Sequence, residues 1–575
     1  MFNNRTYYDY LLLLLLSGVL YLSFLGGSRL WDWDDAINAA TAREMFQRND
    51  WVVPRFNGDL NYNKPIMVTL SIILAYSVFG ITEFAARLPS ALWSMGTILC
   101  VYQIGLSLFN RPIAFRTALV LATMLLFCVE ARAATPDAVL IFWCTAAMMF
   151  YVIGTFQSRT PEEWEADTPP KLRNEGEYFP RSFRFLLPMF AAMGVAVLTK
   201  GPVGFVLPTA VIVLFLLVQW FRGRKIPVSA DVPIKLLWGI IIVLAIAGPW
   251  YVWVGLKTDW AWPSTFLMKH NVGRALAPME GHHGPFYYYL GAVLFDTFPW
   301  SIFCIPVCID IVKRLRRGTP FADGLVLALC WSAVIMGAFS CAATKLPNYI
   351  ATMFPAAAMI YAVFLYYWSK NEELAAKIWT PFALGVYVVV GIVLAAVLVI
   401  ISHPIGDKPA IIPDESVLSL IGILMVLGGL AAFVVWKMSS RRNLELVLRC
   451  VFIVFLASLF FWGAGRVSKH QCYVEMFAAV RAENPNAEFA ILNVLEPSWI
   501  FYSGGPMTML QSGGVEEFLK HNKNGYVLSC EDDYEKFKAK AEFPTRIVAV
   551  APYFLRQKNL VVVSSAIPDD READD

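Results

Sequence analysis

The stretch Trp31-Asp32-Trp33-Asp34-Asp35 through Asn63-Lys64-Pro65 decides how the rest of this chain is arranged. It follows the first hydrophobic segment and places three carboxylates just beyond a membrane-length apolar run. Trp31 and Trp33 suit a membrane–water boundary, because the indole ring is apolar while its N–H can stay hydrated. The stretch is therefore more than a connector between two membrane helices.

Within this loop, the spacing predicts a short helix over residues 34–48. Asp34 or Asp35 can cap its N-terminus, and one side carries Ile37, Ala40, Thr41 and Met45. Such a helix would lie in the membrane interface with its acidic residues at the start. We therefore predict that the loop 28–88 holds the chemistry and that the other helices build a cavity over it.

The composition is that of a polytopic helical membrane protein. Of the 575 residues, 58% are hydrophobic and 16% are charged, whereas soluble domains carry roughly 25% charged residues. Mean hydropathy is +0.55, and apolar runs of spanning length recur along the chain. The first run has no small-residue cleavage site in the usual place, so we interpret it as a retained transmembrane helix.

About 13 membrane spans are predicted. They lie at about 10–27, 89–109, 113–130, 137–155, 184–199, 201–221, 235–255, 286–312, 323–342, 347–368, 376–402, 416–437 and 448–465. The run Ile66 to Phe79 is short for a span, which takes roughly 17–25 residues. If it does not cross and the N-terminus is inside, the basic loops from Arg111 to Arg442 all face inside, as the positive-inside rule requires. We therefore predict a half-inserted helix there.

This topology brings the conspicuous polar residues to one outer face of the membrane. They fall in the loop of Asp34 and Asp35, the turns 135–137 and 199–202, the loop 257–285 and the turn 344–349. The first loop is basic although it lies outside, and an anionic ligand would explain that exception to the charge rule.

From about Val467 the composition changes to that of a small α/β domain, 467–575, on the outside. Helices are predicted at 473–483, 515–521 and 534–541, and strands at 489–494, 526–530, 546–551 and 560–564, the last two buried. Cys472 and Cys530 could form a disulfide if this domain meets an oxidising compartment. Residues 569–575 form an acidic tail that we expect to be disordered.

Two acids are candidates for catalysis. Asp137 opens an apolar helix, where it could simply be an N-cap. Placed across a cavity from Asp34, it could instead join that residue in general-base work, or in holding a divalent ion or a cationic sugar.

Four cations are candidates for binding a phosphate. Lys64 and Lys200 lie at helix ends, where a lysine often only extends to the interface. With Arg274 and Lys345 they would give the cavity a set of positive charges suited to a phosphate or diphosphate leaving group. Tyr349 could reach the same phosphate or belong to the interfacial aromatic belt.

Three of the six histidines, His270, His282 and His283, fall within one outer loop. They could bind zinc or another divalent ion, hydrogen-bond a phosphate or hydroxyl, or serve the loop structurally. The sequence contains no CxxC pair and no His-Cys metal spacing, and we assign no certain cofactor.

Several motifs in order along the membrane part resemble the bacterial lipid A aminoarabinose transferases. These belong to the protein O-mannosyltransferase-like group of C-type glycosyltransferases. The motifs are Asp34-Asp35 with Ala42-Arg43-Glu44-Met45, residues 50–58, Asn63-Lys64-Pro65, residues 83–91, 198–204, 284–289, Phe298-Pro299-Trp300 and Lys345-Leu346-Pro347-Asn348-Tyr349.

The resemblance implies an all-α membrane fold of the C-type glycosyltransferases and inverting transfer of a sugar from a polyprenyl (undecaprenyl) phosphate. It implies that Asp34 and Asp137 are the functional acids and that Lys64, with a later arginine and tyrosine, holds the donor phosphate. The predicted substrate-binding set is Asp35, Tyr62, Lys64, Lys200, His270, Arg274, Lys345, Asn348 and Tyr349. The chain departs from the family at Ile37-Asn38, where an Arg-Tyr pair is usual, and at Asn63, where a glutamate proposed to help bind metal is usual.

The resulting prediction is an inner-membrane glycosyltransferase, monomeric, with its active site and C-terminal domain in the periplasm and with no nucleic-acid partner. It would transfer a 4-amino-4-deoxy-L-arabinose-type sugar to a lipid A phosphate. The first alternative is transfer of another sugar to a protein or glycan hydroxyl. The second is a transporter or flippase for a lipid-linked solute, which would show internal repeats and charges near the membrane midplane.

Overall fold

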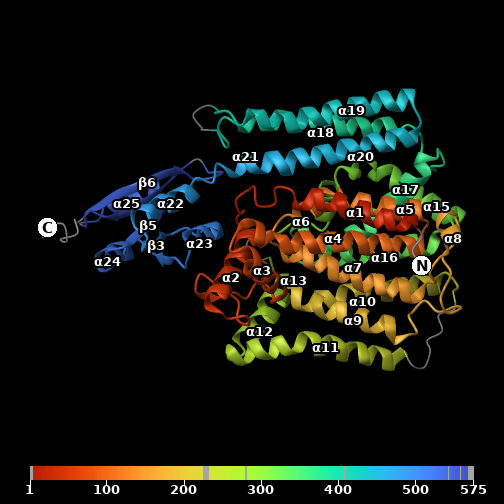
Figure 1. Cartoon of the computed structure of the whole chain (residues 1–575), viewed down its shortest axis with the longest axis horizontal. Helices are drawn as coiled ribbons and strands as arrows, with labels where there is room; N and C mark the ends of the chain where they lie inside the picture. Colours follow the sequence, from red (N-terminus) through yellow and green to blue (C-terminus); the bar gives the residue numbers. More distant parts are fainter. Residues whose placement is uncertain are drawn as a thin grey trace.

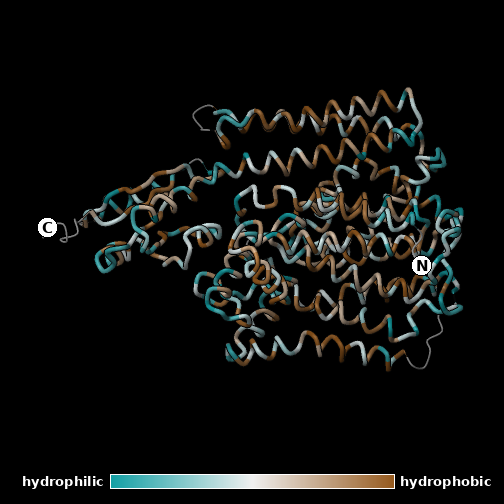
Figure 2. The backbone as a smooth tube through the Cα atoms, viewed as in Figure 1, coloured by the Kyte–Doolittle hydropathy of each residue, from teal (hydrophilic) through white to brown (hydrophobic). Residues whose placement is uncertain are grey.

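In the computed structural model, a bundle of membrane-length helices carries a small mixed domain at one end (Figure 1). The structure describes residues 4–224, 232–278, 281–405, 410–541, 543–556 and 558–566. Hydrophobic residues fill the middle of the helices, while hydrophilic residues gather at the two ends of the bundle and in the terminal domain (Figure 2). This is the distribution expected of a chain that crosses a bilayer several times.

The helices of the bundle, some continuous and some broken into shorter segments, are close to the predicted spans. They are α1 (Asn4–Leu22), α4 (Glu83–Leu108), α5 (Arg111–Ala122), α6 (Leu125–Ala131), α7 (Pro136–Thr155), α9 (Phe183–Lys200), α10 (Val203–Phe221), α11 (Val232–Lys257), α14 (Tyr288–Asp296), η2 (Trp300–Phe303), α15 (Cys304–Arg317), α16 (Ala322–Cys341), η3 (Pro347–Met353), α17 (Phe354–Ser369), α18 (Trp379–Ile401), η4 (Ser416–Ser419), α19 (Leu420–Met438), α20 (Arg441–Ala457), η5 (Ser458–Gly463) and α21 (Ala464–Ser468).

Among the described residues, ten helices are long and apolar enough to span a membrane, or twelve if each of two bent pairs is one span. The bent pairs are α5 with α6, at 67°, and α14 with the segment Trp300–Arg317, at 118°. This is fewer than the 13 spans predicted. Helix α1, the first predicted span, is outside the count because Arg5, Asp9 and several tyrosines make its first half polar.

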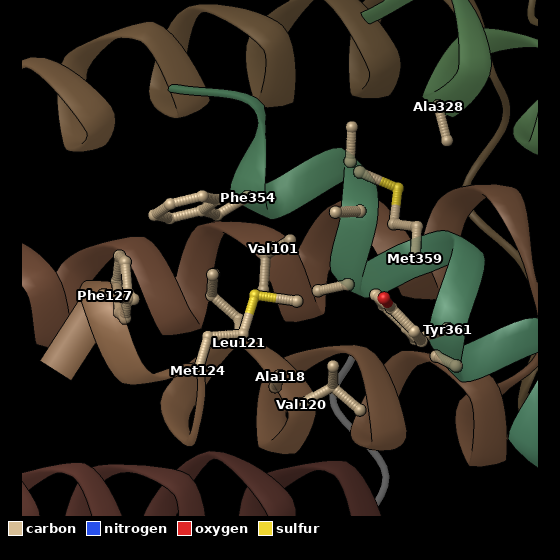
Figure 3. Packing of buried hydrophobic residues seen from close by; sticks show 14 of the residues in the cluster. Val101, Ala118, Val120, Leu121, Met124, Phe127, Ala328, Phe354, Met359 and Tyr361 are labelled. Carbon is tan, nitrogen blue, oxygen red and sulfur yellow. The ribbon is translucent and has the colours of Figure 1, made fainter. Parts of the chain in front are cut away.

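The bundle core surrounds α17, which is buried along nearly its whole length. Figure 3 shows Phe354 and Met359 of this helix packed with Val101 of α4 and with Leu121 and Met124 at the bend between α5 and α6. Contacts of this kind fix the helix ends on which the polar loops are mounted, because close-packed cores tolerate little displacement.

The first loop forms a compact structure at the end of the bundle. It contains α2 (Asp34–Arg48), the two-residue strands β1 (Arg55–Phe56) and β2 (Asp59–Leu60), and α3 (Met67–Phe79). The predicted helix 34–48 is confirmed, and so is a short apolar helix after Lys64, at 13 residues. Two further loops contribute α8 (Pro161–Glu165) at the opposite end, and α12 (Ala261–Thr265), η1 (Phe266–Gly273) and α13 (Arg274–Leu276). Figure 1 shows α12 and α13 at the same end of the bundle as α2.

The terminal domain is a five-stranded sheet in the order β4-β3-β5-β7-β6, parallel between β4, β3 and β5 and antiparallel from β5 to β6. Its elements are α22 (Tyr473–Glu483), β3 (Glu488–Leu492), α23 (Pro497–Ser503), β4 (Thr508–Leu510), α24 (Gly514–His521), β5 (Gly525–Cys530), α25 (Glu531–Lys538), β6 (Thr545–Pro552) and β7 (Asn559–Ser565).

Two parts of the prediction for this domain need correction, and one possibility that it left open is answered. The sequence analysis missed α23 and β4, which are short. The strand at 546–551 was predicted to be buried, but β6 is the edge of the sheet and most of its residues are exposed or half-exposed. Cys472 and Cys530 are both free thiols. The acidic tail at 569–575 lies outside the described residues.

Candidate active site

The polar loops singled out in the sequence do converge at one end of the bundle. Figure 1 places α2, α3, α12 and α13 together at the end that carries the terminal domain, with α8 at the other end. Loop charges and helix lengths were enough to predict this grouping, since each helix that crosses reverses the side of the next loop.

Asp35 is held in a buried ion pair rather than facing open space. Its carboxylate accepts bonds from Arg87 Nη2 at 2.6 Å and Arg87 Nε at 3.2 Å, with side chains 4% and 1% exposed. It also accepts from the backbone N–H groups of Ala134, at 2.7 Å, and Trp31, at 3.0 Å. Asp35 thus ties α2 to α4 and to the loop before Asp137.

Asp34 is the first residue of α2 and is only partly buried. The prediction that Asp34 or Asp35 caps this helix is wrong. The N-cap residue is Trp33, and no side chain forms a capping hydrogen bond there. Asn38 donates to the Asp34 carbonyl at 2.8 Å and to the Ala134 carbonyl at 2.9 Å. Asn38, where the resemblance expects a different residue, therefore fixes the start of α2 against the second acidic loop.

Asp137 lies at the start of α7 and is 2% exposed. One carboxylate oxygen accepts from Lys200 Nζ at 2.6 Å and the other accepts from Asn348 Nδ2 at 3.1 Å. The second acid of the prediction thus meets two members of the predicted phosphate-binding set. Its negative charge offsets one lysine and fixes where that lysine points.

Beside this pair lies a cavity of about 150 Å³ with a cationic wall and an apolar wall. Lys64, Lys200 and Arg274 supply the positive charges. Leu140, Val203, Leu207, Phe266 and Phe339 supply apolar surface, and the remaining lining residues are Asn63, His270, Asn271, Ala275, Ala342, Thr344, Tyr349 and Thr352. Such a cavity suits an anion attached to a hydrocarbon chain.

Lys64 is the cation whose acidity the site alters most clearly. Burial, together with the nearby positive charges of Lys200 and Arg274, lowers the pKa of Lys64 to about 8. The charges of Asp34 and Asp137 act in the opposite direction. A bound anion would raise the pKa of Lys64 again, because a nearby negative charge favours the charged form of the amine.

Tyr349 joins two of the other cations. Its hydroxyl accepts from Arg274 Nη1 at 3.2 Å, and its ring centroid lies 5.1 Å from Lys200 Nζ.

Lys345 is oriented away from this group: its ammonium donates to the carbonyls of Phe339, Ser340 and Ala342 at the C-terminus of α16. Tyr62 packs at the edge of the apolar core around α2 and does not line the cavity.

The three histidines do not line one cavity. His270 lines the cavity, whereas His282 lies beside the exposed Trp33, with ring centroids 6.2 Å apart, and His283 is exposed. Among the residues that the structure describes, no group of three or more His, Cys, Asp and Glu side chains could hold a metal ion. Within this part of the chain, His270, His282 and His283 therefore do not share one metal site.

Sequence reasoning missed Glu130. It is buried in α6, accepts a hydrogen bond from the Thr135 hydroxyl, and lies near the charges of Asp137, Lys200 and Asp34. A single carboxylate inside an apolar segment is itself a signal of function, because such a charge is costly in a membrane.

A second, larger cavity of about 420 Å³ shares no lining residue with the first. Trp31, Ala133 and Arg132 line it at the loop end, next to the residues that hold Asp35. Apart from Ser28, the rest of the lining is apolar: Leu25, Val129, Leu394, Leu398, Leu418, Ile421, Leu459, Phe460, Gly463, Ala464 and Val467. The Arg132 guanidinium lies over the rings of Phe460 and Phe461.

Comparison with known proteins points to one group. Residues 63–165 match the family described as dolichyl-phosphate-mannose-protein mannosyltransferase. The undecaprenyl phosphate-alpha-4-amino-4-deoxy-L-arabinose arabinosyl transferase of Aeromonas hydrophila is 29% identical over 428 residues, 73% of this chain and 71% of that protein. The protein of the same name from Photorhabdus laumondii is 26% identical, over 62% of this chain and 59% of its own length. An Aquifex aeolicus relative is 28% identical and is covered over 64% of its length.

The fold gives the same result over the full chain. The crystal structure of ArnT from Cupriavidus metallidurans bound to undecaprenyl phosphate superposes with a TM-score of 0.75, covering 99% of this chain and 100% of that one at 20% identity. The apo structure of the same protein gives 0.74. The resemblance to the polyprenyl-phosphate glycosyltransferases of the aminoarabinose transferase type, predicted from the motifs, is therefore confirmed in sequence and in fold.

Proposed function

We propose that this chain is a multi-pass membrane glycosyltransferase that uses a polyprenyl-phosphate sugar as donor. The observation that carries the proposal is the convergence of Lys64, Lys200 and Arg274 on one cavity beside Asp34 and Asp137. The names of the similar proteins support undecaprenyl phosphate as the carrier. The donor phosphate would lie against these cations, and its isoprenoid chain would follow the apolar wall.

The reaction breaks the bond between the anomeric carbon of the sugar and a phosphate oxygen. As that bond breaks, the electron pair stays on the phosphate oxygen and the phosphate gains a negative charge. Lys64, Lys200 and Arg274 stabilise this charge before it has fully formed, which lowers the barrier. The acceptor oxygen attacks the opposite face of the anomeric carbon, so the configuration inverts.

The acceptor decides what Asp34 does. A hydroxyl acceptor loses its proton as the new bond forms, and Asp34 would take it. A phosphate acceptor is already ionised and needs no base, so Asp34 would instead hold an amino group of the sugar or position the acceptor. Asp137, paired with Lys200 and Asn348, has the separate task of orienting Lys200.

We propose a lipid A phosphate as acceptor and a 4-amino-4-deoxy-L-arabinose-type sugar as the transferred group. The relatives' names support this sugar, and the second cavity offers an apolar space for acyl chains of a lipid acceptor. The charges of the loops support an orientation in which the loop end of the bundle and the terminal domain face the periplasm, so the acceptor would be presented from that side. Transfer to a protein or glycan hydroxyl is the alternative that the experiment must separate.

The test is lipid A mass spectrometry of cells with and without the protein. A sugar-sized mass gained only with the intact protein supports the proposal and identifies the sugar class. Asp34→Asn and Lys64→Ala should abolish the gain, whereas Asp59→Asn and Lys269→Ala, at exposed positions nearby, should keep it. Unchanged lipid A, with purified protein that still consumes polyprenyl-phosphate sugar, would move the acceptor to a protein or glycan.

A further inference from the structure

One buried arginine of α2 hydrogen-bonds the first loop to the terminal domain. Arg43 is 4% exposed, and its guanidinium donates to the carbonyls of Ile500, at 2.8 Å, and Phe501. Both carbonyls belong to the last turn of α23, where backbone carbonyls run out of backbone donors within the helix. The Ile500 carbonyl also accepts from the Ser503 hydroxyl at 3.0 Å. A cation is favoured at this end of a helix, and Arg43 also lies over the Phe501 ring.

The start and the end of α23 are also bonded to the membrane part. The backbone N–H of Ser498 donates to the Asp32 carboxylate at 3.0 Å. Tyr502 donates through its hydroxyl to Glu83 at 2.9 Å and accepts from the backbone N–H of Leu30 at 2.8 Å. The helix α23 is therefore bonded along its length to the first loop and to the start of α4.

A second contact between the first loop and the terminal domain lies at the tip of the β1–β2 hairpin. Asn57 donates to the Met507 carbonyl at 2.9 Å and accepts from the Met507 N–H at 2.6 Å. The hairpin is in turn held to α2, because the Gly58 N–H donates to Glu44 at 3.1 Å. Residues of α2 and of α22 and α23 share one buried apolar cluster, so the two parts have a common core.

Helix α2 connects these contacts with the terminal domain to the proposed active site. Asp34 begins the helix, and Arg43 is nine residues further along it. Between them, Thr41 accepts from Asn61 Nδ2 at 3.0 Å, and Asn61 accepts from the N–H of Asn63, next to Lys64. A shift of α2 would therefore displace Asp34 and the Lys64 segment together.

We propose that the C-terminal domain is a positioning element for the transfer site, and that α23 holds α2, and with it Asp34 and Lys64, in the reactive arrangement. A 15-residue helix is marginal in water on its own, so α2 depends on such tertiary contacts for its order. Arg43, Tyr502 and Asn57 are positioning residues, because they touch neither of the two cavities. The inference rests on the proposed transfer function.

The experiment compares the full-length protein with Arg43→Gln, Arg43→Lys and Tyr502→Phe, and with Arg546→Gln as control. Arg546 forms an exposed ion pair with Glu483 inside the same domain, so its loss tests charge removal without touching α2. Two quantities are measured: hydrogen exchange of residues 34–66, and kcat and KM for transfer from a polyprenyl-phosphate sugar.

Arg43→Gln should raise exchange in residues 34–66 and lower kcat by about 10- to 100-fold, since small misplacements of reacting groups cost that much, while donor KM changes little. Arg43→Lys should recover part of both, and Arg546→Gln should change neither. Unchanged exchange and kcat in Arg43→Gln and Tyr502→Phe would overturn the proposal, as would an equal rise in exchange over the whole chain.

The exchange measurement separates this inference from the proposed function. If the intact protein transfers no sugar but exchange still rises only over residues 34–66, the positioning contact stands and the transfer function fails. If Arg43→Gln does not fold, Tyr502→Phe decides the question, because it removes only the hydroxyl that bonds α23 to Glu83 and Leu30.

Discussion

Lys200 Nζ lies 2.6 Å from Asp137 Oδ1, and this pair joins the second acidic loop to the cationic wall of the cavity. Asp137 is buried and Lys200 is largely buried, with side chains 3% and 14% exposed. A buried pair that loses one partner leaves an uncompensated charge, so each residue depends on the other. The carboxylate aims the lysine, and the lysine faces the space where a phosphate would be.

This dependence predicts strong coupling between the two residues. Asp137→Asn and Lys200→Met should each lower kcat by roughly 10²-fold or more, since either change weakens stabilisation of the leaving phosphate. The double variant should be little worse than either single one, because both remove the same interaction. A double-mutant cycle in transfer rate checks this. Additive losses would show that Asp137 acts on its own, as a base or a sugar ligand.

Lys64 should give the site a pH dependence. Its pKa of about 8 lies below the ordinary 10.5, so the amine loses its charge near pH 8 when the cavity is empty. A monoester phosphate has a second pKa of about 6 and keeps its charge above pH 7. Binding of undecaprenyl phosphate to the purified protein should therefore weaken as pH rises from 7 to 9.

This weakening of binding between pH 7 and 9 should be absent from Lys64→Met. It should be present in Lys269→Met, because Lys269 is an exposed lysine nearby. Protein stability should change with pH in the opposite direction to phosphate binding. Between about pH 8 and 10.5 the unfolded chain binds more protons at this lysine than the folded protein, so the stability contribution of Lys64 increases over that window. Ligand binding that is flat from pH 7 to 9 in the intact protein would contradict the role assigned to Lys64.

Asp35 should matter for folding more than for chemistry. Its carboxylate satisfies Arg87 and two backbone N–H groups out of contact with solvent. Asp35→Asn should destabilise the protein by roughly 3–5 kcal/mol, the cost of leaving a buried charge unpaired. Thermal unfolding in detergent measures this, with Asp59→Asn as the exposed control. A variant that keeps its stability but loses transfer would instead place Asp35 among the substrate contacts.

The second cavity predicts a selective effect on the acceptor. Ala464→Trp would fill part of the apolar space of about 420 Å³, and should raise KM for a lipid acceptor while leaving binding of undecaprenyl phosphate unchanged. Leu427→Trp, on the exposed side of α19, is the matched control. An equal loss of donor binding would show that the cavity belongs to the donor chain.

The sequence by itself determined the class of fold and the location of the site. Apolar runs and loop charges predicted a membrane bundle whose polar turns share one end, because hydrocarbon forces the backbone into helices and each crossing alternates the side. The helix at 34–48 and the grouping of Lys64, Lys200, Arg274 and Tyr349 followed from the same reasoning, supported by the motif resemblance.

Only the tertiary structure decided which polar residues meet. Asp34 and Asp35 are adjacent in sequence, yet one begins α2 near the cations and the other is buried against Arg87. Lys345 caps α16, Glu130 joins the site from α6, and Arg43 reaches a domain more than 450 residues away. Periodicity gives the face of a helix, but which side chain finds which partner depends on packing between segments distant in sequence, and no local pattern encodes those contacts.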